Sequence, residues 1–173
     1  MENQKINLGI YPPYFYTYIK LVENEDLKTV LKNQVTEYGQ FLNSIPEEKR
    51  LYKYAEGKWS IKEALQHIID AERVFAYRAM AFSRKDVHAL PSFDDKGYAA
   101  NSNADNRKWE DLVEEFITLR KSTEYLFNSF SPEQMDNVGI ASDHEMNAKA
   151  LGYIIAGHAK HHINIIRERY LSN

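Results

Sequence analysis

Helical periodicity is the feature of this sequence that most restricts its fold. Four long segments repeat apolar residues at steps of three and four positions, which is the pattern of an amphipathic helix. Only 7 glycines and 5 prolines occur in the 173 residues, so few residues interrupt these segments. The predicted helices cover residues 25–44, 60–83, 106–130 and 147–171. We therefore expect an all-α fold that is dominated by four long helices.

Local signals mark the ends of several helices. Ser60 and Glu63 have the spacing of a capping box, in which each side chain accepts a hydrogen bond from the backbone of the other residue. Pro46 ends the first long helix because proline cannot continue the hydrogen-bond ladder. Ser131 and Pro132 begin a further one-turn helix. A proline pair also favours a short helix over residues 13–22.

Residues 86–105 break the helical pattern with a proline, a glycine and a run of asparagine and serine. A connection of this length without structure of its own is unusual inside a compact domain. It would let the helices before and after it run parallel, which a short turn does not allow. We therefore expect one domain over residues 1–173, a four-helix bundle with a long crossover between its second and third helices.

Composition and charge exclude several classes of function. The chain has no cysteine, which rules out disulfides, thiolate metal sites and cysteine nucleophiles. The net charge is -3, and no stripe of basic and aromatic residues suits nucleic acid. Residues 1–10 lack the pattern of a signal peptide, and no segment approaches the roughly 20 apolar residues that span a bilayer. We expect a cytoplasmic protein without a nucleic-acid or membrane partner.

Three histidines stand out as candidate metal ligands. His158 and His162 are four residues apart on the apolar side of the last helix, so both rings face the same way. Buried polar groups need partners, and a divalent transition metal would satisfy both rings. The spacing alone leaves open a second interpretation, two histidines hydrogen-bonded in or beside the core. His67 lies among small residues on the second helix, where it can supply a third nitrogen from another helix.

Two nearby residues are candidates to support the three histidines. Asp70 follows His67 by three residues, so its carboxylate can orient the ring or contact a bound water; a solvated surface acid is the alternative. His161 lies beside the apolar stripe of the last helix and faces either the same pocket or solvent. We expect His88 and His144 to be solvated, because both lie in loop-like regions.

The remaining polar and aromatic residues are interpreted as structural. Glu72, Arg73 and Arg78 are spaced as surface or boundary ion pairs on the second helix. We expect Trp59 and Trp109 to anchor the starts of helices. The tyrosines of the first fifty residues are expected to pack in the core or at interfaces rather than to line a binding site.

Three stretches of the chain resemble one known family. The second helix reads KWSIKE at residues 58–63 and, after His67, DAERVFAYR at residues 70–78. The crossover contains LPSFD at residues 90–94, and the last helix contains GHAKHH followed by RERY within residues 157–170. In order and spacing these stretches resemble the DinB-like family of DNA-damage-inducible, metal-binding helical bundles, over residues 59–170.

The resemblance implies an up-down-down-up bundle with a zinc or nickel site held by His67, His158 and His162. It also implies a possible homodimer. The family is related to metal-dependent transferases that use bacterial low-molecular-weight thiols, and to a branch described as metal-dependent hydrolases. The resemblance slightly favours a thiol transferase with such a thiol as its second cofactor.

Two other functions remain open. A metal-dependent hydrolase of a small amide or ester needs a general base, and Asp70, Glu72 and His161 are the candidates. A non-catalytic stress-response binding module would use the metal only to tie two helices together. Either enzyme would act on a small-molecule substrate. Open coordination positions at the metal favour an enzyme over a structural site.

Overall fold

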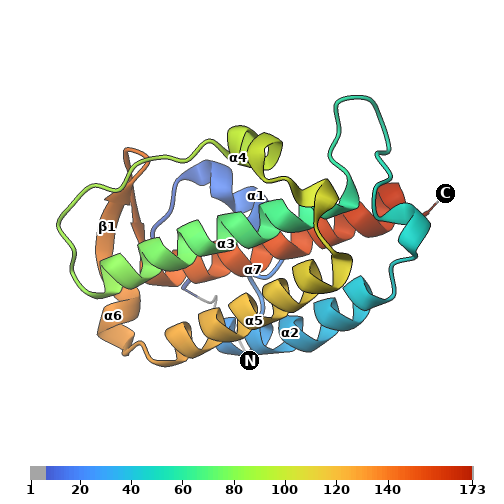
Figure 1. Cartoon of the computed structure of the whole chain (residues 1–173). Helices are drawn as coiled ribbons and strands as arrows, with labels where there is room; N and C mark the ends of the chain where they lie inside the picture. Colours follow the sequence, from blue (N-terminus) through green and yellow to red (C-terminus); the bar gives the residue numbers. More distant parts are fainter. Residues whose placement is uncertain (1–6, 173) are drawn as a thin grey trace.

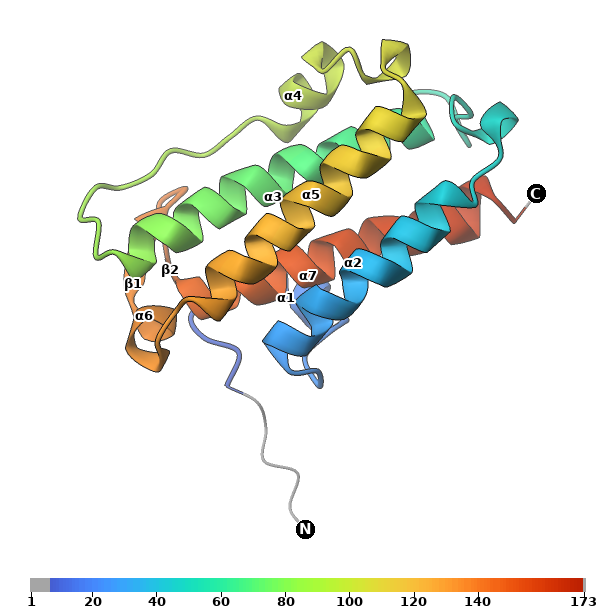
Figure 2. The same cartoon turned by 60° about the horizontal axis from the view of Figure 1, so that its bottom comes forward.

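The described residues, 7–172, form a bundle of four long helices in this computed structural model (Figure 1). The bundle helices are α2 (Leu27–Asn43), α3 (Ile61–Ser83), α5 (Trp109–Asn128) and α7 (Ala148–Ile165). Helix α3 packs against α7 and α5, and α2 packs against α5 and α7. Helices α3 and α5 run in one direction while α2 and α7 run in the other (Figure 2). The expected up-down-down-up topology with a long crossover is confirmed.

Side-chain caps fix the starts of three bundle helices. The predicted capping box is present: the Ser60 hydroxyl accepts a hydrogen bond from the Glu63 amide at 3.0 Å, and the Glu63 carboxylate accepts one from the Ser60 amide at 2.8 Å. Asp26 caps α2, and Asn147 caps α7 by accepting from the Ala150 amide at 3.0 Å. These contacts satisfy backbone donors that a helix start otherwise leaves unpaired.

Short elements connect and flank the bundle. They are η1 (Pro13–Phe15), α1 (Tyr16–Ile19), η2 (Glu47–Lys49), α4 (Asp95–Asn101), η3 (Ala104–Asn106), α6 (Pro132–Asp136) and the π-helical turn η4 (Ile166–Tyr170) that prolongs α7. The predicted one-turn helix after Ser131 is therefore α6, with both hydrogen bonds of its capping box. The predicted short helix over residues 13–22 corresponds to η1 and α1.

A two-stranded hairpin precedes α7 and was not predicted. Strands β1 (Val138–Ala141) and β2 (His144–Asn147) are antiparallel, with Val138 opposite Asn147. Their two-residue turn places Ser142 and Asp143 at φ of 53° and 62°. A turn with two positive φ angles usually carries asparagine or glycine, so this sequence lacks the common signal of a hairpin.

The crossover is more ordered than the sequence indicated. Residues 86–105 were expected to be structureless, but they contain α4 and most of η3. The Asp94 side chain starts α4 by accepting a hydrogen bond from the Gly97 amide at 2.9 Å. Of the α4 residues only Ala99 is buried, so the segment has too little apolar periodicity to be recognised as a helix. Helix α4 packs across α3 (Figure 1), which places the crossover over one face of the bundle.

The core consists of two apolar clusters with a polar layer between them. One cluster centres on Phe15, Phe82 and Phe127, and the other on Tyr38, Trp109 and Phe116. Each bundle helix contributes at least one buried polar side chain to the layer. These residues are Gln34 of α2, His67 and Glu72 of α3, Arg120 of α5 and His158 of α7.

No helix within residues 7–172 is long and apolar enough to cross a membrane. The expectation about a signal peptide concerns residues 1–10, of which residues 1–6 lie outside the described part of the chain.

Candidate metal centre

The three predicted histidines converge on one point between α3 and α7. His67 comes from α3, while His158 and His162 come from successive turns of α7. One ring nitrogen from each residue lies within 4.8 Å of the others. The Nε2 atoms of His67 and His158 are 3.0 Å apart. The four-residue spacing on α7 and the packing of α3 against α7 together produce this cluster.

A close approach of α1 to α7 positions the aromatic wall beside the cluster. A Cβ atom at Gly157 would lie 2.2 Å from the carbonyl oxygen of Tyr18, so only glycine allows α1 this close. As a result the Tyr18 ring lies 5.2 Å from the rings of both His158 and His161. On the other side, the Trp59 ring lies 4.6 Å from that of His67. Trp59 therefore does more than anchor a helix start.

Burial keeps the three imidazoles neutral. Burial lowers the pKa of His67 to about 4 and, with the nearby His67 and His161 rings, the pKa of His162 to about 3. The pKa of His158 also lies well below its ordinary value, because the ring is buried and the neighbouring histidines oppose its protonation. Neutral imidazole is the form that binds metal, so the site is prepared for a cation at neutral pH.

The donor set fits a divalent transition metal. Nitrogens bound to one ion at about 2.0–2.1 Å with angles of 90–109° lie roughly 2.9–3.4 Å apart. The 3.0 Å separation of the His67 and His158 nitrogens falls in this range. The other ring nitrogens of the three residues have no hydrogen-bond partner among residues 7–172. Zinc, nickel and cobalt all accept three imidazole nitrogens.

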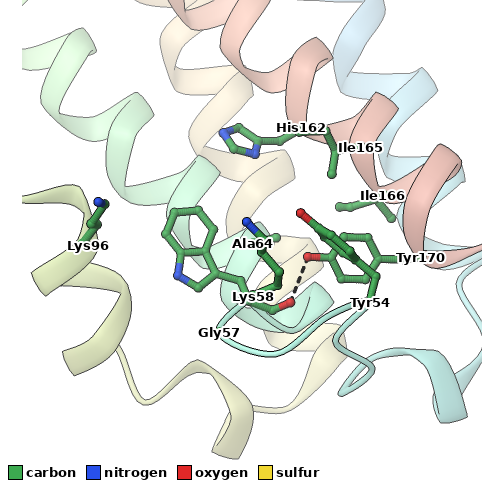
Figure 3. Close-up of a pocket in the computed structure, with 10 residues that line it drawn as sticks. Tyr54, Gly57, Lys58, Ala64, Lys96, His162, Ile165, Ile166 and Tyr170 are labelled. Carbon is green, nitrogen blue, oxygen red and sulfur yellow. Dashed lines mark hydrogen bonds between the residues drawn. The ribbon is translucent and has the colours of Figure 1, made fainter.

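Two cavities reach the cluster. The first, of about 530 Å³, opens onto His162 and is lined by Trp59, Lys58, Lys96 and the tyrosines Tyr54 and Tyr170, among others. Figure 3 shows His162 on α7 facing this cavity and Lys96 on α4 at its edge. The second, of about 320 Å³, contains His67 and His158 together with Tyr14, Tyr18, Arg78 and Asp95. Cavities of this size suit small molecules.

The two supporting candidates occupy different places. Asp70 forms no hydrogen bond with His67; it accepts one from Gln66 at 2.9 Å and lies 3.8 Å from the Arg73 guanidinium. His161 is half-buried, and its ring lies 5.1 Å from that of His162. Burial lowers the pKa of His161. His161 therefore flanks the cluster, whereas Asp70 belongs to the ion pairs between α3 and α5.

The interpretation of Glu72 and Arg78 as surface or boundary ion pairs was wrong. Glu72 is buried and binds Arg120 of α5, with both carboxylate oxygens 3.0 Å from Nε. Arg78 is buried and lines the second cavity. Glu72 faces α5, whereas Arg78 faces the crossover and the hairpin turn, and local spacing reveals neither environment. Arg73 does lie at the surface and pairs with Glu115 at 2.6 Å. The solvated positions expected for His88 and His144 are confirmed.

Several cavity residues were missed in the sequence. Asp95 and Lys96 begin α4, and each lines one of the two cavities. Tyr14 and Tyr18 line the second cavity, although the early tyrosines were expected to have packing roles only. The negative charge of Asp95 acts to raise the pKa of His67, against the larger effect of burial. No local signal marks these residues, because the crossover and α1 reach the cluster only through tertiary packing.

Comparison with known proteins identifies the family. The sequence profile of the DinB superfamily matches residues 31–166, and this chain belongs to that superfamily. The protein named "Putative metal-dependent hydrolase OB0413" from Oceanobacillus iheyensis is 26% identical over 155 residues, which cover 83% of this chain and 84% of that protein.

A solved structure shares the fold. YfiT from Bacillus subtilis, described as "a probable metal-dependent hydrolase with an unusual four-helix bundle topology", superposes with a TM-score of 0.69 and 16% sequence identity. The match covers 95% of this chain and 90% of YfiT. At this identity the likeness supports the bundle topology alone.

Proposed function

We propose that this protein is a metal-dependent hydrolase of small molecules, with His67, His158 and His162 as its metal ligands. The observation that carries the proposal is the convergence of three neutral imidazoles on a point that two cavities reach. The names of the relatives from Oceanobacillus iheyensis and Bacillus subtilis support the same class of reaction.

The chain's own residues account for binding and proton transfer. A divalent ion in this site would polarise a bound carbonyl group and make water more acidic. Trp59 and Tyr18 cover the histidine rings on two sides and restrict bulk water. The cavity beside His67 has aromatic walls that include Phe75, which suits the apolar part of a substrate.

Asp95 is the best-placed proton acceptor. It lines the same cavity as His67 and His158, and its side chain is exposed enough to exchange protons with solvent. Glu72 is committed to Arg120, and Asp70 lies outside both cavities. His161 lines neither cavity, although its pKa is lowered by burial. We assign the role of general base to Asp95.

Thiol transfer is the second candidate reaction. The cavity of about 530 Å³ beside His162 carries Lys58 and Lys96, whose charges suit an anionic low-molecular-weight thiol. The chain has no cysteine, so a sulfur nucleophile would come from such a cofactor. A purely structural metal is less well supported, because the cavities give ligands access to the histidines.

The test is a panel of ester and amide substrates, assayed with zinc- or nickel-loaded protein alongside thiols paired with an electrophile. We expect hydrolysis without any thiol, its loss in His158→Ala, and full retention in the matched control His144→Ala, because His144 is exposed. Asp95→Asn should lower kcat by about 100-fold, the typical contribution of a general base. Turnover only with a thiol present would replace hydrolysis by thiol transfer. No turnover in either assay would reject both reactions.

A further inference from the structure

Arg78 is a buried cation without a carboxylate partner. Arg78 is only 3% exposed, and its Nη2 atom donates hydrogen bonds to the Pro91 carbonyl at 2.7 Å and to the Ser142 hydroxyl at 3.1 Å. No acidic side chain among residues 7–172 forms an ion pair with it. Burial lowers the pKa of Arg78, but a guanidinium stays charged at neutral pH. Burying a charge without a counter-ion costs folding free energy, so the position of Arg78 indicates a functional role.

Arg78 lines the second cavity and has guanidinium donors that no group of the described residues uses. Arg78 lines this space of about 320 Å³ together with His67 and His158. Its Nε and Nη1 atoms have no hydrogen-bond partner within residues 7–172, and they are not sealed from solvent. The rings of Phe75 and Phe93 each lie 5.9 Å from the guanidinium carbon. The donors are thus held in place by aromatic side chains and backbone, and they remain available to a ligand.

We propose that Arg78 binds a carboxylate of the substrate while the bond to be cleaved lies at the three histidines. The proposal rests on the proposed hydrolase function and names its substrate class: small amides or esters that carry a carboxylate. Arg78 is the only arginine or lysine that lines this cavity among the described residues. Since Asp95 also lines it, a singly charged carboxylate fits better than a phosphate dianion. Asp95 forms no ion pair with Arg78, so it does not occupy the free guanidinium donors.

A purely structural role for Arg78 is the alternative. Its two hydrogen bonds tie the crossover at Pro91 to the hairpin turn at Ser142. The same two segments are also joined by Leu90, whose amide donates to the Ile140 carbonyl at 2.9 Å. A residue that only ties these segments would affect stability, but it would not distinguish an anionic ligand from its neutral analogue.

The first test is equilibrium binding of benzoate and its neutral analogue benzamide to the full-length protein in its zinc-free form, in which no metal can bind the carboxylate. We expect benzoate to bind roughly tenfold or more tightly than benzamide, as a charge-assisted hydrogen bond predicts. Arg78→Met should abolish this preference, and Arg78→Lys should retain part of it. The matched control Arg84→Met should keep it, because Arg84 follows α3 outside both cavities. Equal binding of benzoate and benzamide, or a preference that survives in Arg78→Met, would overturn the proposal.

A measurement on the unaltered protein covers the case in which Arg78→Met does not fold. The nitrogen NMR signal of Arg78 Nε should move as benzoate is added and stay in place with benzamide. Absence of this movement overturns the proposal. Binding of inorganic phosphate is measured in the same way, and tighter binding of phosphate than of benzoate would reject the assignment to a carboxylate.

The second test separates this inference from the proposed function. The zinc-loaded protein should hydrolyse monomethyl glutarate with a lower KM than methyl butyrate, and Arg78→Met should remove the difference in KM while kcat changes little. Failure to hydrolyse either ester would reject the hydrolase while the benzoate result still decides the carboxylate site. Hydrolysis of both esters with equal KM would reject Arg78 as the specificity residue and leave the hydrolase standing.

Discussion

Two buried polar clusters lie side by side in this bundle and differ in how many of their donors and acceptors form hydrogen bonds within the protein. In the first, Arg120 donates to Glu72 and to the Gln34 side-chain oxygen, and Gln34 donates to the Ala156 carbonyl at 3.1 Å. In the second, the only hydrogen-bonding contact within residues 7–172 is between the rings of His67 and His158. A cluster that pairs its own groups stabilises the fold, whereas a cluster that leaves donors and acceptors unused is suited to a ligand.

The first cluster also shapes the second. Gln34 binds the carbonyl of Ala156, two residues before His158 on α7. The positive charge of Arg120 adds to the burial and neighbouring rings that lower the pKa of His158. The Gln34 hydrogen bond therefore ties α2 to α7 beside His158, and the charge of Arg120 helps to keep His158 neutral, which is the form that binds a metal.

Removing Glu72 from the cluster of Glu72, Arg120 and Gln34 should have the largest effect on stability. Glu72→Ala leaves the charge of Arg120 buried without its partner, so we expect the free energy of unfolding to fall by about 3–5 kcal/mol. Chemical denaturation measures it. The exposed ion pair of Lys85 and Glu133 provides the control, and Glu133→Ala should leave the free energy of unfolding almost unchanged because solvent screens this pair. Equal losses in the two variants would contradict the structural role of the Glu72–Arg120 pair.

Binding of a metal ion to the cluster of His67, His158 and His162 should stabilise the folded protein. Zinc at 100–1,000 times its Kd should add about 3–4 kcal/mol to the free energy of unfolding, because only the folded state holds the site. Thermal denaturation with and without a chelator measures this gain. His67→Ala should lose it and His88→Ala should keep it, because His88 is exposed and distant in sequence from the cluster. A gain of the same size in His67→Ala would place the metal elsewhere.

The pH dependence of the metal-free protein tests the buried imidazoles. Histidines in the unfolded chain bind protons below about pH 6.5, whereas His67 has a folded pKa of about 4 and His162 of about 3. Between these values the unfolded state binds more protons than the folded state. The stability that the neutral histidines contribute is therefore complete above pH 6.5 and falls as the pH drops towards 4. His67 alone should contribute roughly 3 kcal/mol to this loss.

The matched variant for this measurement is His67→Gln, which cannot titrate. Denaturation curves between pH 7 and 4 should show a shallower loss of stability than in the unaltered protein. Slopes that coincide would mean that the His67 ring becomes protonated in the folded state.

The smallest effect concerns the wall of the first cavity. The Tyr170 hydroxyl donates a hydrogen bond to the Trp59 carbonyl at 2.8 Å (Figure 3). Tyr170→Phe should lower stability by about 1 kcal/mol and leave the metal stoichiometry unchanged, as measured by denaturation and elemental analysis. A loss of bound metal would show that this bond holds the histidine cluster together.

The long helices and the shared face of His158 and His162 were predictable because both depend on periodicity within single helices. The meeting of these two histidines with His67 depends on the packing of α3 against α7, and the sequence indicated it chiefly through the resemblance to the DinB-like family. The apolar repeats fixed α2, α3, α5 and α7 to within a few residues, and the spacing of His158 and His162 placed them on one face. The ion pair of Glu72 and the cavity positions of Arg78 and Asp95 were not predictable. They depend on how α5, the hairpin and α4 pack across α3, and a local pattern of charges does not encode that packing.

Anomalous diffraction at the zinc absorption edge, from a crystal of the full-length protein loaded with one equivalent of zinc, tests the proposed metal site most directly. We expect a single strong peak at about 2.0–2.1 Å from one nitrogen each of His67, His158 and His162. A peak at another position, or no peak between α3 and α7, would contradict the assignment of these histidines as metal ligands.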